Sequence, residues 1–400
     1  MVKMKRQLTG IQNGDLPPEI MHEILSRLPV KPLCRFKCVS KPWRSLISHP
    51  DFVAKYSKVI ENKDVFFQRR RLLFTFVRQE HHWLYSLDLD QFLNENHNVD
   101  VGGLVATPAE LDFVYKPLPR GGRDWIPFVH YSSYGLFLSR ICCGDFSFSL
   151  INPVTKESKK LPKTPIWRLP MKPLFRGVSL NGLGFDYSTN VYKVVNGQHY
   201  DDGTVFSVYS LQTDSWRQID YLFPYKALDF DGIVVNGAVH WLVRKVADRS
   251  LVIISFLLAE EEVREIPLPP IPGTCSSQLG VFRNWLCITL ALPRAEIART
   301  NNEFWVMKEY GVTESWTKMQ VSKPYKELSH SSFWTESHDL MLFDKSLVMY
   351  NFNDGTFWNL SISDLSENGH FGSIGIYVES LPSLTDQEQH KRSKEDKSTQ

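Results

Sequence analysis

The chain has 400 residues, of which 42% are hydrophobic, with 11 Trp, 15 Tyr and 25 Phe. This length and aromatic content predict two or more folded units and exclude a mainly disordered chain. The 46 Lys and Arg against 44 Asp and Glu give a net charge of +2, which excludes binding to polyanions through overall charge alone. The charge is uneven, because residues 1–50 hold nine basic and three acidic side chains, a local net charge of +6.

No membrane segment is expected, because the longest nearly apolar run, 251–259, is far shorter than the ~20 residues of a spanning helix. The basic start leads into polar residues rather than the apolar core of a signal peptide. The six cysteines lack the spacing of a disulfide framework or a zinc finger. We therefore expect a cytoplasmic or nuclear protein, or one in both places, with no metal and no cofactor.

Residues 1–13 are polar and are predicted to be a flexible N-terminus, whereas residues 14–55 have the pattern of a small helical unit. Ile20, Ile24 and Leu28 recur every fourth residue, which gives one apolar face to a helix. Three short helices in about forty residues bury little surface on their own. The apolar face is therefore expected to have a partner, although it could also be the core of the helical unit itself.

Prolines and a serine set the predicted helix bounds. Pro18 suits the first turn of the first helix and Pro29 ends that helix. Pro32 can open the second helix. Ser40 is a suitable N-cap for the third, which has Pro42 in its first turn.

Residues 60–380 are expected to form a mainly β, propeller-like repeat domain of six to eight blades. Short segments rich in β-branched and aromatic residues alternate with turn signals, and a hairpin pattern recurs about every 45–60 residues. Its six instances lie at 84–92, 149–162, 208–219, 253–269, 304–319 and 348–360. Residues 386–400 have alternating charges and nothing to bury, so a disordered tail is expected. The fold class is thus α+β with several domains.

Residues 14–55 resemble an F-box, most closely in DLPPEIMHEILSRLPVKPLCRFKCVSKPWRSLISHPDF. The downstream chain resembles the F-box-associated, kelch-like region of plant F-box proteins, a group with immune-regulatory and S-locus members. The matching phrases are GLGFDYSTNVYKVV, VYSLQTDSWRQI, VVNGAVHWLV, SFLLAEEEVREIPLP, LGVFRNWLCI and EFWVMKEYGVTESWTKM. Pro32 and Pro42 depart from the family, which often has Ser there, and Tyr134 stands where it commonly has Asn.

The resemblance implies a non-catalytic substrate receptor of an SCF ubiquitin ligase. The F-box would bind a Skp-type adaptor, which bridges to a cullin-RING scaffold, and the β domain would hold an unknown protein substrate for ubiquitination and proteasomal degradation. By position, the adaptor-binding residues would be Leu16, Pro17, Ile20, Ile24, Leu25, Leu28, Pro29, Leu33, Val39 and Trp43. A basic rim of Arg35, Lys37, Lys41 and Arg44 would steer association with an acidic adaptor.

Substrate contact is expected in loops, because a rigid propeller presents variable loops at its faces. The candidate loops lie near 116–124, 159–176 and 293–303. The candidate side chains are Lys159, Lys160, Trp167 and Arg168. The second loop is basic with interleaved aromatic residues, a pattern that also suits nucleic acid, but the nearly neutral chain makes that the weaker interpretation.

Other functions remain open as alternatives. No phosphate loop, zinc helix or nucleophile elbow is present in the sequence. A stand-alone propeller that acts as a binding protein, a lectin or a hydrolase is the alternative to the ligase role. His240 lacks a neighbouring nucleophile and is expected to be a structural histidine. Five tryptophans are expected to pack between blades, and they are Trp216, Trp241, Trp305, Trp316 and Trp358.

Overall fold

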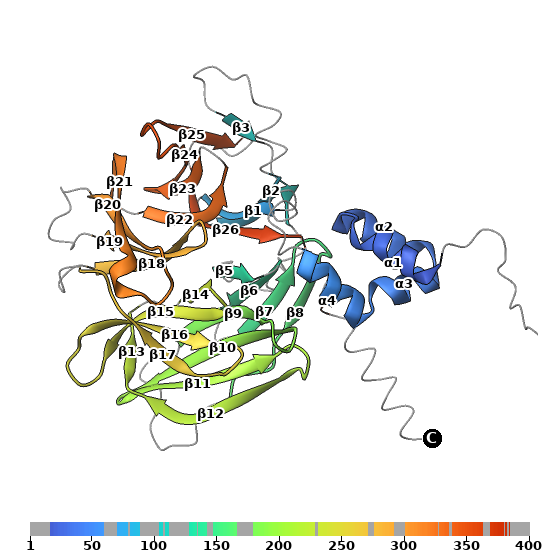
Figure 1. Cartoon of the computed structure of the whole chain (residues 1–400), viewed down its shortest axis with the longest axis horizontal. Helices are drawn as coiled ribbons and strands as arrows, with labels where there is room; N and C mark the ends of the chain where they lie inside the picture. Colours follow the sequence, from blue (N-terminus) through green and yellow to red (C-terminus); the bar gives the residue numbers. More distant parts are fainter. Residues whose placement is uncertain are drawn as a thin grey trace, which may run out of the picture.

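The structure is a computed structural model of the whole chain (Figure 1). The residues it describes are 17–59, 70–78, 81–88, 104–106, 109–111, 128–133, 135–141, 147–165, 179–228, 231–270, 276–291, 301–326, 328–335, 338–362, 369–379, 381 and 384. Within these ranges, no helix is long and apolar enough to span a membrane.

The N-terminal region is helical, with four helices where three were predicted. They are α1 (Pro18–Ser26), α2 (Val30–Val39), α3 (Lys41–Ile47) and α4 (Pro50–Val59). Pro18 opens α1, and the Ser40 hydroxyl caps α3 by accepting a hydrogen bond from the Trp43 backbone N–H at 3.3 Å, as predicted. The fourth helix was missed, although the four-residue spacing of Phe52 and Tyr56, both buried, was its sequence signal.

The rest of the described chain forms a six-bladed propeller of mainly four-stranded antiparallel sheets. Blade 1 contains β26 (Gly369–Val378), β1 (Arg70–Arg78), β2 (His81–Leu87) and β4 (Ala109–Glu110). Blade 2 contains β5 (Phe128–Ser133), β6 (Leu136–Ile141), β7 (Ser147–Asn152) and β8 (Glu157–Lys160), and blade 3 contains β9 (Ser179–Asp186), β10 (Val191–Tyr200), β11 (Gly203–Ser210) and β12 (Ser215–Phe223).

The second half of the propeller is built in the same way. Blade 4 contains β13 (Tyr225–Ala227), β14 (Ile233–Val235), β15 (Ala238–Lys245), β16 (Leu251–Leu257) and β17 (Val263–Ile266). Blade 5 contains β18 (Ser276–Phe282), β19 (Trp285–Ala291), β20 (Asn301–Met307) and β21 (Trp316–Tyr325), preceded by the short η3 (Thr313–Ser315). Blade 6 contains β22 (Leu328–Trp334), β23 (Asp339–Phe343), β24 (Ser346–Tyr350), β25 (Phe357–Ile362) and the added strand β3 (Leu104–Ala106).

The six hairpins predicted from the sequence repeat correspond to the six blades. Five of them join the third and fourth strands of blades 2 to 6, and the phrase at 84–92 covers the end of β2 in blade 1 before it leaves the described residues. The expected range of six to eight blades is thereby narrowed to six. The ring closes because β26, from the end of the chain, pairs antiparallel with β1.

The apolar core of the propeller lies in layers between neighbouring blades. One layer joins blades 1 and 6 through Phe74 and Leu340, for example, and another joins blades 3 and 4 through Phe206 and Trp241. As predicted, tryptophans pack in these layers; they are Trp216, Trp241, Trp305, Trp316 and Trp358.

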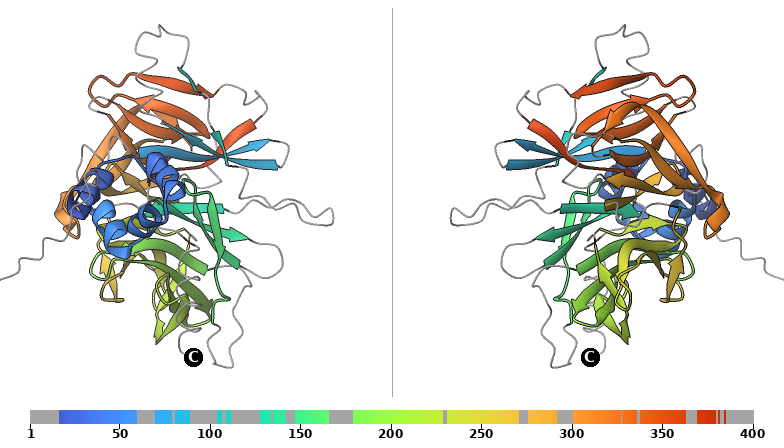
Figure 2. Two further views of the ribbon diagram at one scale, coloured as in Figure 1. Left: turned by 90° about the vertical axis from the view of Figure 1, so that its right-hand side faces the viewer. Right: turned by 90° about the vertical axis from the view of Figure 1, so that its left-hand side faces the viewer.

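The helices lie together at one side of the propeller (Figure 1, Figure 2). Their core includes Leu381, which follows β26, and is packed by Val154 from the β7–β8 turn. We call the face that carries this turn the helix-side face. Neighbouring strands of a blade run in opposite directions. The turns from the first to the second strand and from the third to the fourth strand therefore lie on the helix-side face. The turns from the second to the third strand, and the connections from one blade to the next, lie on the opposite face, which we call the loop-side face.

Candidate functional site

Among the described residues of the helical domain, three large aliphatic side chains are exposed. Ile20 and Ile24 lie one turn apart on α1 and are 49% and 44% exposed, and Val39 ends α2 and is 69% exposed. We call these residues the exposed apolar set. Large exposed apolar groups in a soluble domain are typical of a protein-binding surface when they gather on one small unit.

The other residues predicted to bind an adaptor are placed differently. Leu25 and Leu33 are buried in the helical core, so they support the surface from inside and do not form it. Leu28 and Trp43 are half-buried against that core, and Pro17 and Pro29 are exposed. Leu16 lies outside the described residues.

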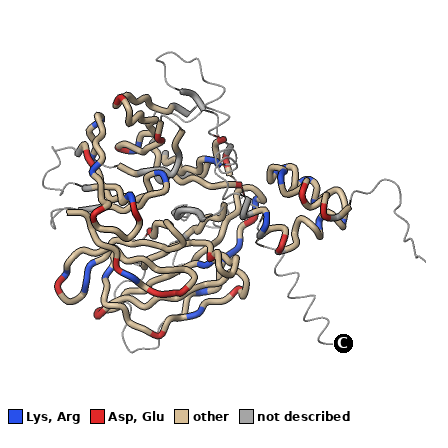
Figure 3. The backbone as a smooth tube through the Cα atoms, viewed as in Figure 1, with Lys and Arg blue, Asp and Glu red and all other residues tan. Residues whose placement is uncertain are grey.

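The helical domain carries more basic than acidic side chains, with seven Lys or Arg and three Asp or Glu in residues 17–55 (Figure 3). No acidic residue occurs between Glu23 and Asp51, whereas the predicted rim residues lie in that interval. Three of them are exposed and Lys37 is half-buried; the exposed ones are Arg35, Lys41 and Arg44. Within the described ranges, no carboxylate forms an ion pair with any of the four.

Glu23 on α1 is an acidic residue whose charge is compensated by basic residues of the helical domain itself. Glu23 accepts hydrogen bonds from Arg27 at 2.8 Å and from Lys55 at 3.0 Å. These contacts, that of Arg27 first, hold the pKa of the Glu23 carboxyl below its usual value. The helical domain therefore presents exposed apolar groups together with an excess of positive charge on α2 and α3, while the exposed Glu19 lies in the first turn of α1.

The predicted substrate side chains are only partly described. The prediction that Lys159 contacts a substrate is wrong. Lys159 lies in β8 with 8% exposure, and its Nζ is 3.1 Å from Asp214 Oδ1 in the neighbouring blade. It joins blades 2 and 3 and is not available to a substrate or to nucleic acid. Lys160, the last residue of β8, is exposed. Trp167 and Arg168, the loop 116–124 and residues 293–300 lie outside the described residues.

His240 is a structural histidine, as predicted. It is fully buried, its Nδ1 donates to the Ile233 carbonyl at 3.0 Å, and its Nε2 accepts from the Tyr310 hydroxyl at 2.6 Å. Burial lowers its pKa to about 4, so the ring is neutral at physiological pH. In the described part of the chain, no group of three His, Cys, Asp or Glu side chains is arranged to hold a metal ion.

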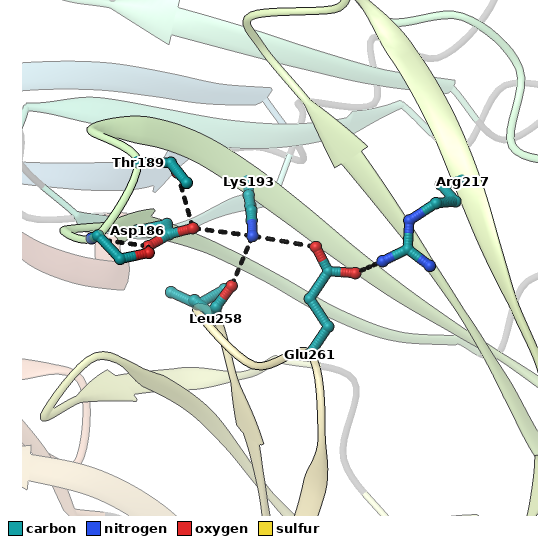
Figure 4. A network of polar contacts seen from close by, with 7 residues as sticks. Asp186, Thr189, Lys193, Arg217, Leu258 and Glu261 are labelled. Atoms are coloured by element: carbon teal, nitrogen blue, oxygen red, sulfur yellow. Dashed lines mark hydrogen bonds and ion pairs between the residues drawn. The ribbon is translucent and has the colours of Figure 1, made fainter.

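A buried polar network, which the sequence did not predict, joins blades 3 and 4 (Figure 4). Lys193 Nζ donates to the Leu258 carbonyl at 2.6 Å and pairs with Asp186 at 2.9 Å and Glu261 at 3.0 Å. Glu261 also pairs with Arg217. Every charge in this network has a partner, so it serves the packing of two blades and offers no free reactive group.

Asp186 is the buried acid of this network. Burial alone would raise its pKa, but hydrogen bonds from Ser188, Lys193 and Thr189 outweigh burial and lower the pKa to about 2. The phrase GLGFDYSTNVYKVV, used for the family resemblance, contains these residues. Its glycines have a packing role too, because a Cβ added to Gly182 or Gly184 would overlap side chains of blade 4.

Two family models match the chain. The F-box domain model matches residues 14–55, and the F-box associated beta propeller domain model matches residues 127–384, more than half of the chain. The structure extends that propeller toward the N-terminus, because β1, β2 and β4 complete the blade that contains β26.

Plant proteins are similar over most of the length. An F-box/kelch-repeat protein of Arabidopsis thaliana is 29% identical over 356 residues, covering 86% of this chain and 89% of the relative. The F-box protein CPR1 of Arabidopsis thaliana is 28% identical over 345 residues, covering 79% of this chain and 75% of the relative. Each of these similarities therefore extends over more than three quarters of the chain.

Proposed function

We propose that the chain, which belongs to the family of F-box proteins with an F-box associated beta propeller domain, has the role expected of that family. This role is to be the substrate-recognition subunit of an SCF-type ubiquitin ligase. The F-box binds a Skp-type adaptor, and the adaptor links it to the cullin-RING scaffold. The propeller holds a protein substrate for ubiquitination. The role requires no catalytic group in this chain, because the ligase machinery supplies the chemistry.

The observation that carries the proposal is the exposed apolar set together with the basic residues of α2 and α3. Burying Ile20, Ile24 and Val39 against a partner removes apolar surface from water, which supplies affinity. Arg35, Lys41 and Arg44, which form no ion pair with a described carboxylate, would then face the acidic surface of the adaptor and speed association. Neither feature has a function within the helical domain, whose own core lies elsewhere.

Calorimetric titration of the full chain with a plant Skp-type adaptor tests this role. Ile24→Asp should weaken binding at least ~100-fold, because the new carboxylate must be desolvated in the interface. Val312→Asp is the matched control, since Val312 is also exposed but lies in the β20–β21 turn of blade 5. Equal weakening by both variants, or no binding by the folded full chain, would overturn the proposal and favour a stand-alone propeller.

We infer that the substrate binds at the loop-side face. The chain enters the segments 112–127 and 161–178 from the fourth strands of blades 1 and 2, and it enters 292–300 from the second strand of blade 5. These strands all end at the loop-side face, away from the F-box. Exchanging the loops near 116–124, 159–176 and 293–303 with those of a relative should change the set of bound proteins, and an unchanged set would contradict the assignment.

A further inference from the structure

The chain does not leave the molecule at the end of the closing strand β26. Glu379, Leu381 and Leu384 are all buried. Glu379 pairs with Arg71 of β1, Leu381 enters the helical core, and Leu384 enters the apolar layer between blades 2 and 3. Three buried residues within six positions thus contact three different parts of the molecule.

A polar contact fixes the end of this segment. The Leu384 backbone N–H donates to Glu157 Oε2 at 2.9 Å, and the Thr155 hydroxyl donates to the same oxygen at 3.0 Å. Glu157 begins β8, directly after the turn whose Val154 packs on the helical core. The segment and this turn therefore meet at the boundary between the helices and blade 2.

Helix α2 contributes the facing surface. Cys34 on α2 is half-buried, and burial is the main reason that the pKa of its thiol is raised. The charge of Lys37 opposes this effect, whereas the charges of Glu157 and Glu379 add to it. Leu33 of α2 and Leu381 belong to one apolar core, and both Cys34 and Val154 pack against it. Helices, blade 2 and the chain end form one continuous packed region.

We propose that Glu379, Leu381 and Leu384 form a strap that clamps the F-box onto the propeller, so that the two domains fold as one cooperative unit and keep one relative orientation. The chain connects the domains twice, once after α4 and again through the strap. The proposal goes beyond the ligase role and stands without it. If the ligase role also holds, the strap fixes the adaptor surface relative to the substrate face.

Thermal unfolding of two shortened chains tests the strap with separate probes for each domain. Far-ultraviolet circular dichroism reports the helices, which in the described chain are α1 to α4. Tryptophan fluorescence reports the propeller, because Trp43 is the one tryptophan of 11 that lies in the helical domain. A chain that ends at Thr385 lacks only the tail, whereas a chain that ends at Glu379 lacks Leu381 and Leu384.

In the full chain and in the chain that ends at Thr385, the two signals should change at one temperature. In the chain that ends at Glu379, the helix signal should change several degrees below the fluorescence signal, and the fluorescence transition should itself fall because Leu384 is lost from the layer between blades 2 and 3. Coincident transitions at the full-chain temperature after loss of the strap, or separate transitions in the full chain, would overturn the proposal.

Two point variants of the full chain test the strap if the chain that ends at Glu379 does not fold. Leu381→Asp places a charge in the helical core and should separate the two transitions. Leu228→Asp is the matched control, because Leu228 is an exposed leucine that follows β13 in blade 4. Identical behaviour of the two variants would contradict the strap. Adaptor affinity, measured in parallel, reports on the ligase role separately, since the exposed apolar set is intact in every one of these chains.

Discussion

His240 in blade 4 and His199 in blade 3 are buried, and both are held neutral. Burial lowers the pKa of each ring from 6.5 to about 4, and for His199 the charge of Lys226 adds to this effect. The His199 Nδ1 lies 2.7 Å from the Thr204 hydroxyl, which itself donates to the Tyr225 carbonyl. Between pH 6.5 and about 4, each histidine binds a proton in the unfolded chain but stays neutral in the folded chain. Folding stability therefore depends on pH in this range.

The sign follows from the lowered pKa. The contribution of each histidine to folding stability is complete above pH 6.5 and is lost as the pH falls from 6.5 through about 4. His240→Gln should therefore reduce the pH slope of the unfolding free energy in this window by roughly 1.4 kcal/mol per pH unit. Urea unfolding at several pH values measures the slope, and an unchanged slope would show that His240 accepts a proton in the folded state.

Single residues differ in how far their role could be read from sequence. His240 was identified as structural because no nucleophile or orienting acid stands beside it. Leu25 and Leu33 could not be separated from Ile20 and Ile24, because apolar spacing identifies a helix face but not which part of it a second layer covers. Lys159 was misassigned because its partner, Asp214, is distant in sequence and meets it only when blades 2 and 3 stack.

Lys193 of β10 connects blade 3 to blade 4, because it pairs with Asp186 at the end of β9 and with Glu261 in the β16–β17 turn. The Asp186 side chain has no exposure and that of Lys193 has 10%, so removing the Lys193 charge leaves Asp186 buried with the hydroxyls of Ser188 and Thr189 but without its ion-pair partner. Lys193→Met should cost about 3–5 kcal/mol of unfolding free energy. Lys245→Met is the control, because its ion pair with Glu265 is exposed and should be worth less than about 1 kcal/mol.

A double variant separates charge from packing. Asp186→Asn combined with Lys193→Met removes both charges and should be more stable than Lys193→Met alone, as measured by denaturant unfolding. Additive losses would instead mean that the two side chains act independently. The low pKa of Asp186 also means that this contribution is complete above pH 3.8 and is lost as the pH falls through about 2.

At the level of whole elements, the sequence repeat was informative because each hairpin has the same physical plan. The turn between the third and fourth strands contains a residue with a left-handed backbone conformation, such as Asp214 or Glu261. In the sequence, such a position is visible only as a polar residue or a glycine. The tryptophan of the fourth strand donates its indole N–H to a proline carbonyl of the preceding blade, Trp216 to Pro162 at 2.8 Å and Trp316 to Pro267 at 2.9 Å. This contact explains why aromatic and Leu-Pro positions recur together.

Long-range pairings could not be obtained from the repeat. The addition of β3 to blade 6 in parallel with β25, and the burial of Leu381 among the helices, join segments that lie more than 250 residues apart. Local spacing has no signal for such contacts.

At the scale of the whole molecule, the two faces of the propeller carry different elements. The helix-side face holds the start of β1, the end of β26 and the β7–β8 turn, so the F-box is attached there. The candidate substrate loops begin from strands that end at the loop-side face. If the proposed ligase role holds, adaptor and substrate therefore bind at different faces and do not compete for surface.

Hydrogen exchange of the full chain with and without a plant Skp-type adaptor tests the central claim most directly. The account predicts slower exchange in residues 17–44, which hold the exposed apolar set and the basic rim, and unchanged exchange in the strands of blades 3 to 6. Protection confined to the propeller, or no protection when both proteins are folded, would contradict it.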